Sequence, residues 1–158
     1  MKVVIVTGTP GTGKTTLAKK LAKKLDYDYI DINKVVKENK LNKEYDKKRK
    51  CYVVDINKLN KALIKIIKNS KKSSIIDSHL SHNLPKKYVD VCIVTKCDLK
   101  ELQRRLKKKN YAKQKIRENL DCEIFDICLN EAKEAGHKVV VIKTTKGLNI
   151  AAISKKIK

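Results

Sequence analysis

The feature that most constrains the fold of this chain is a glycine-rich run between an apolar stretch and an amphipathic one. Residues 8–16 read Gly-Thr-Pro-Gly-Thr-Gly-Lys-Thr-Thr, which fits the pattern G-x-x-x-x-G-K-[ST]. Residues 3–6 before it are β-branched, as in a buried strand, and residues 14–25 after it have the apolar spacing of a helix. Three of the five glycines in the chain lie in this run, which argues against a chance match.

Each residue type in the run suits a phosphate group. Gly11 and Gly13 let the backbone turn its N–H groups toward an anion, and the start of the helix adds a partial positive charge. Lys14 would reach the β- and γ-phosphates, the Thr15 hydroxyl would bind Mg²⁺, and Thr16 would hold an α-phosphate oxygen. The run therefore predicts a P-loop that binds ATP together with Mg²⁺.

Strand and helix patterns alternate along the rest of the chain, which predicts an α/β fold with a parallel sheet between two layers of helices. We expect strands at residues 3–6, 27–32, 74–77, 89–94 and 138–143. We expect helices at residues 14–25, 59–67, 99–106, 116–128 and 148–157. The stretches 31–54 and 107–118 are interpreted as irregular insertions, where substrate contacts tend to lie.

No repeat or linker divides the sequence, so residues 1–158 are expected to form a single domain. No apolar run approaches the roughly 18 residues of a membrane span, and we expect a cytoplasmic protein without a membrane partner. The five cysteines lack C-x-x-C spacing, which favours free thiols in a reducing compartment.

The formal net charge of +22 comes almost entirely from lysine, and such a field attracts polyanions such as RNA. Two observations favour a merely lysine-rich surface instead. The lysines are spread along the chain, and few aromatic residues are available to stack on bases. Both interpretations remain open from charge alone.

A second acidic site is expected where the third strand ends. Asp77 closes the run Ser-Ile-Ile-Asp, and a P-loop needs an acid on a neighbouring strand to position Mg²⁺. His79 follows two residues later and could orient an attacking water, or it could be a loop histidine bonded to the backbone. His82 is expected to be a loop histidine of that kind.

The stretch after the fourth strand offers two interpretations. Residues 95–98 read Thr-Lys-Cys-Asp, the T-K-x-D pattern that reads guanine in GTPases, but the run from Asp77 lacks the glycine of D-x-x-G. The basic cluster of Arg104, Arg105 and residues 107–109 instead favours the lid of a nucleoside monophosphate kinase, which closes over the transferred phosphate and excludes water. A solvated basic helix end is the alternative for this cluster.

Three blocks of sequence carry a resemblance to a known family. They are residues 7–16, the Asp77-Ser78-His79 run, and residues 106–125, which end in Cys-Glu-Ile-Phe. In order and spacing the chain resembles, over nearly its whole length, the archaeal and eukaryotic adenylate-kinase-like ATPases of the adenylate kinase isoenzyme 6 type.

This resemblance implies a three-layer P-loop NTPase fold of the nucleoside monophosphate kinase type, with a five-stranded parallel sheet of order 2-3-1-4-5. The monophosphate-binding segment would span about residues 31–54 and the lid about residues 108–118. The implied activities are Mg²⁺-dependent transfer of phosphate from ATP to AMP or a related monophosphate, and ATP hydrolysis. The family also implies a role in late maturation of the small ribosomal subunit and its 16S rRNA, with transient binding of the platform ribosomal protein number eleven.

The sequence departs from the family where arginines are expected. The usual Arg-Gly-Tyr of the lid is Lys109-Asn110-Tyr111, and Lys37 takes the place of the arginine on the monophosphate side. Lysine keeps the charge but loses the bidentate fork, so we expect slow kinase turnover, with Lys109 acting in catalysis and Lys37 and Arg105 binding substrate. A purely metabolic small-molecule kinase and a GTPase-like switch stay open as alternatives.

Overall fold

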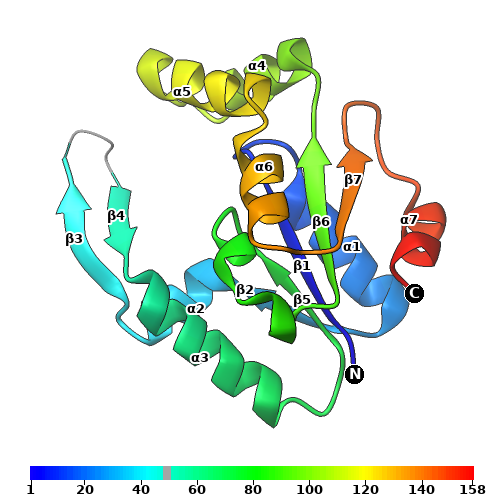
Figure 1. Cartoon of the computed structure of the whole chain (residues 1–158). Coiled ribbons are helices and arrows are strands. Elements are labelled where there is room, and N and C mark those ends of the chain that lie inside the picture. Colours follow the sequence, from blue (N-terminus) through cyan, green and yellow to red (C-terminus); the bar gives the residue numbers. More distant parts are fainter. Residues whose placement is uncertain (48–50) are drawn as a thin grey trace.

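A five-stranded parallel sheet forms the centre of the molecule in a computed structural model (Figure 1). The structure describes residues 1–47 and 51–158, and the side chains of all of these except 43–46, 51 and 52. The sheet consists of β1 (Val3–Gly8), β2 (Asp28–Asp31), β5 (Ser74–Asp77), β6 (Val91–Lys96) and β7 (Val139–Lys143). Their order is β2-β5-β1-β6-β7, which is 2-3-1-4-5 when only the strands of this sheet are counted.

Helices cover both faces of the sheet, which explains why β1 and β5 are buried along their whole length. On one face, Val4 and Val6 share a core with α1 (Lys14–Leu25) and α7 (Ile150–Ile157). On the other, Val3 and Ile5 share a core with α2 (Ile32–Glu38), α3 (Ile56–Asn69) and α6 (Ile127–Glu134). The predicted α/β class with three layers is confirmed.

The prediction that the stretch 31–54 is irregular is wrong. It contains α2 and a two-stranded antiparallel sheet of β3 (Asn42–Asp46) and β4 (Cys51–Val54). Because these two strands are numbered in chain order, the last three strands of the main sheet are β5, β6 and β7. The hairpin stands apart from the main sheet (Figure 1), so its strands are not the continuous apolar runs by which buried strands are recognised. Residues 48–50 of the predicted monophosphate-binding segment lie outside the described residues.

The predicted long helix over residues 116–128 is also wrong. The chain forms α5 (Lys113–Ile124) and then α6, with a break at Asp126, whose φ is +51°. Aspartate tolerates this left-handed conformation, and the side chain of Asp126 binds Lys96 on the end of β6. The apolar periodicity continues across the break, so the pattern alone could not reveal it.

An arm of two helices lies above the carboxyl ends of the strands (Figure 1). It consists of α4 (Leu99–Lys108) and α5, and a small core of Leu102, Leu106 and Ile116 holds the two helices together. Two short 3₁₀ turns, Ser81–Asn83 and Lys86–Tyr88, link β5 to β6 on the side of the sheet that α6 covers. Among the helices of the described residues, none is long and apolar enough to cross a membrane.

Candidate active site

The glycine-rich run forms a tight loop between β1 and α1. Gly11 and Gly13 have φ values of +92° and +88°, a region that glycine adopts without strain. A Cβ on Gly11 would also lie 2.9 Å from Leu106 Cδ2, so the loop packs closely under α4. Gly13 sits at the start of α1, where the first N–H groups of the helix have no partner within the helix. The predicted phosphate-binding geometry is therefore available at this loop.

Lys14 lies across its own loop. Its Nζ donates hydrogen bonds to the carbonyl oxygens of Gly8 and Thr9, at 2.8 and 3.2 Å. Burial lowers the pKa of Lys14 to about 8, and the nearby positive charge of Lys109 also lowers it, while the negative charge of Asp77 opposes the shift. A partly buried ammonium of this kind is suited to binding an anion that compensates its charge.

The structure brings together Thr15 and Asp77, the two residues predicted to bind metal. Parallel pairing sets Asp77 beside Val6, just ahead of the loop, and Thr15 Oγ1 donates a hydrogen bond of 2.7 Å to Asp77 Oδ2. Hydroxyl and carboxylate oxygens are the hard donors that Mg²⁺ prefers, so this pair fits the ion.

Tyr29 on β2 is a site residue that the sequence analysis missed. Its hydroxyl donates a hydrogen bond of 2.8 Å to the same Asp77 Oδ2 that Thr15 contacts. Burial and the hydrogen bond to Asp77 raise the pKa of Tyr29, so the hydroxyl keeps the proton that it donates. No motif marks this tyrosine, which is one of six in the chain.

The two histidines after β5 have different surroundings. The His79 side chain is exposed to solvent on one side. The protein around the rest of the imidazole still removes enough water to lower its pKa, and the positive charge of Lys14 lowers the pKa further. His82 is buried, with Nδ1 3.0 Å from Thr7 Oγ1 and Nε2 2.6 Å from Glu131 Oε2. The second histidine therefore has a structural position, as expected, but its ring is bonded to side chains of β1 and α6 and not to the backbone.

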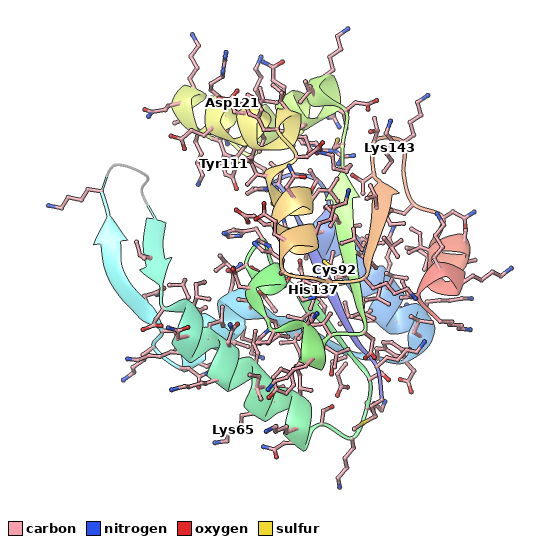
Figure 2. The ribbon with its side chains drawn as sticks, viewed as in Figure 1. Lys65, Cys92, Tyr111, Asp121, His137 and Lys143 are labelled. Atoms are coloured by element: carbon pink, nitrogen blue, oxygen red, sulfur yellow. The ribbon has the colours of Figure 1, made fainter. Side chains whose placement is uncertain are left out.

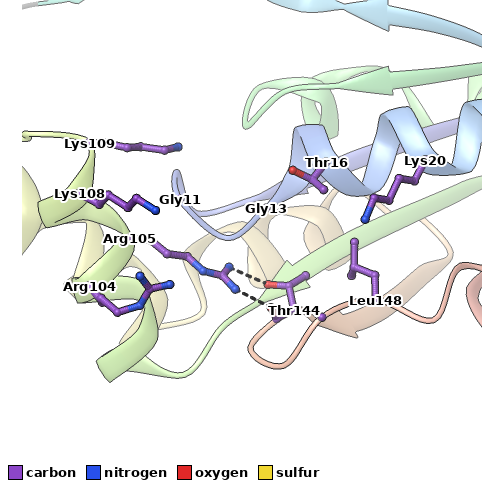
Figure 3. A pocket seen from close by; sticks show the side chains of 11 residues that line it. Gly11, Gly13, Thr16, Lys20, Arg104, Arg105, Lys108, Lys109, Thr144 and Leu148 are labelled. Atoms are coloured by element: carbon purple, nitrogen blue, oxygen red, sulfur yellow. Dashed lines mark hydrogen bonds between the residues drawn. The ribbon is translucent and has the colours of Figure 1, made fainter.

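Two cavities meet at the loop, and both border on Gly11, Gly13, Thr16 and Lys109. One, of about 460 Å³, is also lined by Lys14, Thr15, Asp31, Asn33, Asp77, His79, Tyr111 and Lys115. The other, of about 540 Å³, is also lined by Lys20, Arg104, Arg105, Lys108, Thr144, Gly147 and Leu148 (Figure 3). We call them the acidic-side cavity and the arginine-side cavity. Lys37 lies on the exposed last turn of α2 and lines neither of them.

Arg105 is held rigidly at the mouth of the arginine-side cavity (Figure 3). Its Nε donates to Glu101 Oε1 at 3.0 Å, and its Nη2 donates to the Thr144 carbonyl oxygen at 2.7 Å. The guanidinium therefore joins α4 to the loop after β7, and it is fixed close to Gly13 of the phosphate loop.

The backbone of the predicted lid turn explains why asparagine can take the place of the glycine in Arg-Gly-Tyr. Asn110 has a φ of +58°, and asparagine is among the few residues besides glycine that adopt this conformation readily. Lys109 on one side of it borders both cavities, and Tyr111 on the other lies on the underside of the arm, toward the sheet (Figure 2). Lys115 Nζ lies 4.4 Å from the centre of the Tyr111 ring, so both side chains border the acidic-side cavity as a pair.

A second group that sequence analysis did not assign to the site is Glu123 at the end of α5. Its carboxylate accepts hydrogen bonds from Lys96 Nζ at 2.5 Å, from the Cys97 N–H at 2.9 Å and from Thr9 Oγ1 at 3.3 Å. Glu123 thus fastens the base of the arm to the phosphate loop and to the end of β6. The Cys-Glu-Ile-Phe run was the only signal that could have marked it.

The same network accounts for the run that resembles a guanine-reading motif. Lys96 is ion-paired with both Glu123 and Asp126, and Thr95 Oγ1 lies 2.6 Å from Thr12 Oγ1 beneath the phosphate loop. The residues of this run are therefore engaged in contacts within the protein.

The sequence of this chain is similar to those of known proteins over most of its length. The family model described as "AAA domain" matches residues 4–126. An adenylate kinase isoenzyme 6 homolog of Caenorhabditis elegans is 36% identical over 138 residues, which are 87% of this chain and 76% of that protein. The homolog of Schizosaccharomyces pombe is 39% identical over 140 residues, covering 89% and 79%.

A solved structure supports the fold alone. Shikimate kinase from Bacteroides thetaiotaomicron superposes with a TM-score of 0.56 over 98% of this chain and 95% of that one, at 14% identity. The phosphate loop, the paired Thr15 and Asp77, and the sequence relatives agree with one another. The chain therefore belongs to the adenylate kinase isoenzyme 6 family and is a kinase of the P-loop fold.

Proposed function

We propose that this protein transfers the γ-phosphate of ATP to AMP or a related nucleoside monophosphate, and that it also hydrolyses ATP. The observation that carries the proposal is the meeting of two cavities at the phosphate loop, beside Lys14 and the Thr15–Asp77 pair. The nucleoside of ATP would occupy the arginine-side cavity near Arg105, and the acceptor would enter the acidic-side cavity.

Lys14 and the loop backbone would bind the β- and γ-phosphates, while Thr15 and Asp77 would hold Mg²⁺. The bound ion would neutralise charge on the phosphate oxygens. Tyr29 fixes one oxygen of the Asp77 carboxylate, which keeps the carboxylate oriented toward Thr15. Catalysis would come mainly from positioning and electrostatic stabilisation, because phosphoryl transfer needs little covalent chemistry from the protein.

The lid residues would contribute positive charge from above. Lys109 borders both cavities, so its ammonium can follow the phosphate as it passes from donor to acceptor. Each lysine offers a point charge in place of the fork of an arginine, which supports slow turnover.

His79 would act when water takes the place of the monophosphate. It lines the acidic-side cavity with Asp77, and its lowered pKa favours the neutral imidazole at pH 7. A neutral imidazole nitrogen can accept a proton from a water molecule and orient it for attack. Hydrolysis would then depend on His79 more strongly than transfer to a nucleotide does.

The net charge of +22, together with the lysines that stand where the family has arginines, favours a second function. ATP hydrolysis would drive a step in late maturation of the small ribosomal subunit and its 16S rRNA, during which the platform ribosomal protein number eleven is bound and then released. Binding of that protein and of rRNA fragments, measured with ATP and with ADP, tests this role. Equal affinity in both nucleotides would argue against a nucleotide-driven release.

The decisive experiment for the enzyme is ADP formation from ATP and Mg²⁺, with and without AMP, CMP, GMP and UMP. We expect AMP to accelerate ADP formation, with two ADP produced for each ATP consumed. If no monophosphate accelerates the reaction, transfer to a nucleotide is refuted and hydrolysis is left as the activity.

A further inference from the structure

Helix α3 presents a row of lysines to the solvent. The row consists of four exposed side chains at steps of three, four and three residues, namely Lys58, Lys61, Lys65 and Lys68. Residues three and four apart lie on the same side of a helix, so the four ammonium groups follow one line along α3. Figure 2 shows one of them, Lys65, pointing away from the sheet. We call these four residues the lysine row.

No acidic residue within the helix compensates this charge. Residues 56–69 contain neither aspartate nor glutamate, and among the described residues none of the four lysines has an ion-pair partner. Other helices pair a basic residue with an acid one turn away, as Lys34 with Glu38 on α2 and Arg117 with Asp121 on α5. Like charges at this spacing repel one another and destabilise a helix. The lysine row therefore lacks the interleaved charges of an ordinary solvated helix face.

Helix α1 also lacks acidic residues, but its lysines do not form such a row. Lys19 and Lys20 are adjacent, so their side chains point about 100° apart around the helix. Lys19 Nζ lies 5.6 Å from the centre of the Tyr29 ring, and Lys20 lines the arginine-side cavity. These lysines have other contacts, whereas those of the lysine row face the solvent together.

The apolar side of α3 is fully engaged in the core. Leu59 and Leu63 are buried, and Ile66 and Ile67 pack against the same core cluster. This packing fixes the lysine row on the scaffold of the protein. It also leaves α3 without an apolar face for insertion into a bilayer, which a helix at a membrane surface needs. The helix is therefore suited to a polyanion in solution rather than to an anionic membrane.

We propose that the lysine row binds the phosphate backbone of double-stranded RNA. From Lys58 to Lys68 the row is about 15 Å long, which corresponds to about four steps between successive phosphates of one strand. Lysine supplies point charges that follow a backbone without reading bases, and α3 contains no aromatic residue on which an unpaired base could stack. RNA is the commonest polyanion in a cell. The inference deepens the second proposed function, on which the choice of RNA rests, and gives rRNA a binding surface.

A pair of charge-matched variants tests the lysine row against diffuse positive charge. The first combines Lys58→Gln, Lys61→Gln, Lys65→Gln and Lys68→Gln. The control makes the same change at four exposed lysines of α1 and α7, which cover the other face of the sheet, namely Lys23, Lys24, Lys155 and Lys156. Neither variant removes a buried group, and melting curves check that both are folded.

Binding of a short RNA duplex of mixed sequence to the full-length proteins is measured by fluorescence anisotropy at several salt concentrations. We expect the dissociation constant to rise by about tenfold to a hundredfold in the α3 variant, from the loss of four exposed charge contacts. In the control it should rise by less than about threefold, because distant charges are screened. The slope of log affinity against log salt should become shallower by about 3 to 4 in the α3 variant, since each lost phosphate contact removes about 0.9.

Equal losses in the two variants, or an unaltered protein that does not bind the duplex, would overturn the lysine row as an RNA-binding surface. Tighter binding of polyglutamate or of phosphatidylserine vesicles than of RNA at the same salt concentration would overturn the choice of RNA. ATP binding and ADP formation should be unchanged in the α3 variant, because the lysine row borders neither cavity at the phosphate loop. The maturation role fails separately, since equal binding of the ribosomal protein with ATP and with ADP would refute it even if the row binds RNA.

Discussion

Replacing Glu123 by alanine should loosen the arm and the phosphate loop together. The carboxylate is 6% exposed and accepts hydrogen bonds from Lys96, Cys97 and Thr9. In Glu123→Ala the buried Cys97 N–H would lose its partner, at a cost of about 1–3 kcal/mol, and the Thr9 hydroxyl would lose about 1 kcal/mol. Lys96 keeps its second partner, Asp126, so its charge is not left unpaired.

These contributions sum to a loss of about 3 kcal/mol in the free energy of unfolding, at the lower end of the range for breaking a buried ion pair. For a chain of 158 residues this corresponds to a fall of about 6–12 °C in the unfolding temperature. Burial lowers the pKa of Lys96, but its hydrogen bonds to Asp126 and Glu123 raise that pKa above its ordinary value. The stabilisation from Lys96 is therefore fully present at pH 7 and is lost only as the pH rises through the raised pKa.

Thermal and urea unfolding at pH 7 measure the effect, with Glu118→Ala on the exposed side of the same helix as the control. We expect the control to lie within about 0.5 kcal/mol of the unaltered protein. Glu123→Gln should fall between the two, because its amide oxygen can still accept one hydrogen bond. A loss below about 1 kcal/mol in Glu123→Ala would refute the reasoning, since it would mean that the three hydrogen bonds add nothing beyond those made with water.

The remaining expectations concern the phosphate loop and the metal-side acid. Lys14→Ala should abolish both ADP formation and ATP hydrolysis, and an active variant with unchanged ATP affinity would contradict the assignment. Because the pKa of Lys14 is lowered to about 8, ATP affinity measured by titration calorimetry should fall as the pH rises from 8 to 9 and the ammonium loses its proton; a flat profile would exclude this contact. Asp77→Asn should reduce Mg²⁺-dependent hydrolysis by at least about tenfold with the circular dichroism spectrum unchanged, and an unaltered Mg²⁺ requirement would count against its role. Tyr29→Phe removes one hydrogen bond to Asp77, worth about 1 kcal/mol, so the Mg²⁺ concentration for half-maximal activity should shift by about fivefold in either direction; no shift would leave the hydroxyl without a role in metal binding.

The residues of the site that were predicted from sequence either follow one another in a short motif or stand at the end of a strand. The glycines, Lys14 and Thr15 follow one another in a motif whose spacing fixes their geometry. Asp77 could be predicted because it ends an apolar run, and the ends of parallel strands meet at one edge of the sheet. The alternation of strand and helix patterns likewise predicted the α/β class with a parallel sheet between two layers of helices.

The parts that were missed depend on contacts between distant segments. Tyr29 and Asp77 are 48 positions apart, and Thr9 and Glu123 are 114 apart, so no periodicity links them. The break before α6 was hidden because apolar residues continue across Asp126, whose left-handed backbone is compensated by an ion pair with Lys96. The hairpin of β3 and β4 was missed because it is not buried in the main sheet, and strand recognition relied on burial.

The attachment of the arm limits how much of it can move. Gly11 is in contact with Leu106 near the end of α4, and Thr9 is hydrogen-bonded to Glu123 at the end of α5. Each of the two helices of the arm is thereby joined to the phosphate loop. We expect any opening to be a short excursion of the turn between the two helices, with the arm as a whole staying in place. Spectroscopic labels on α4 and on the core would then report almost constant separation through the reaction cycle, and a label beside Asn110 would report the change.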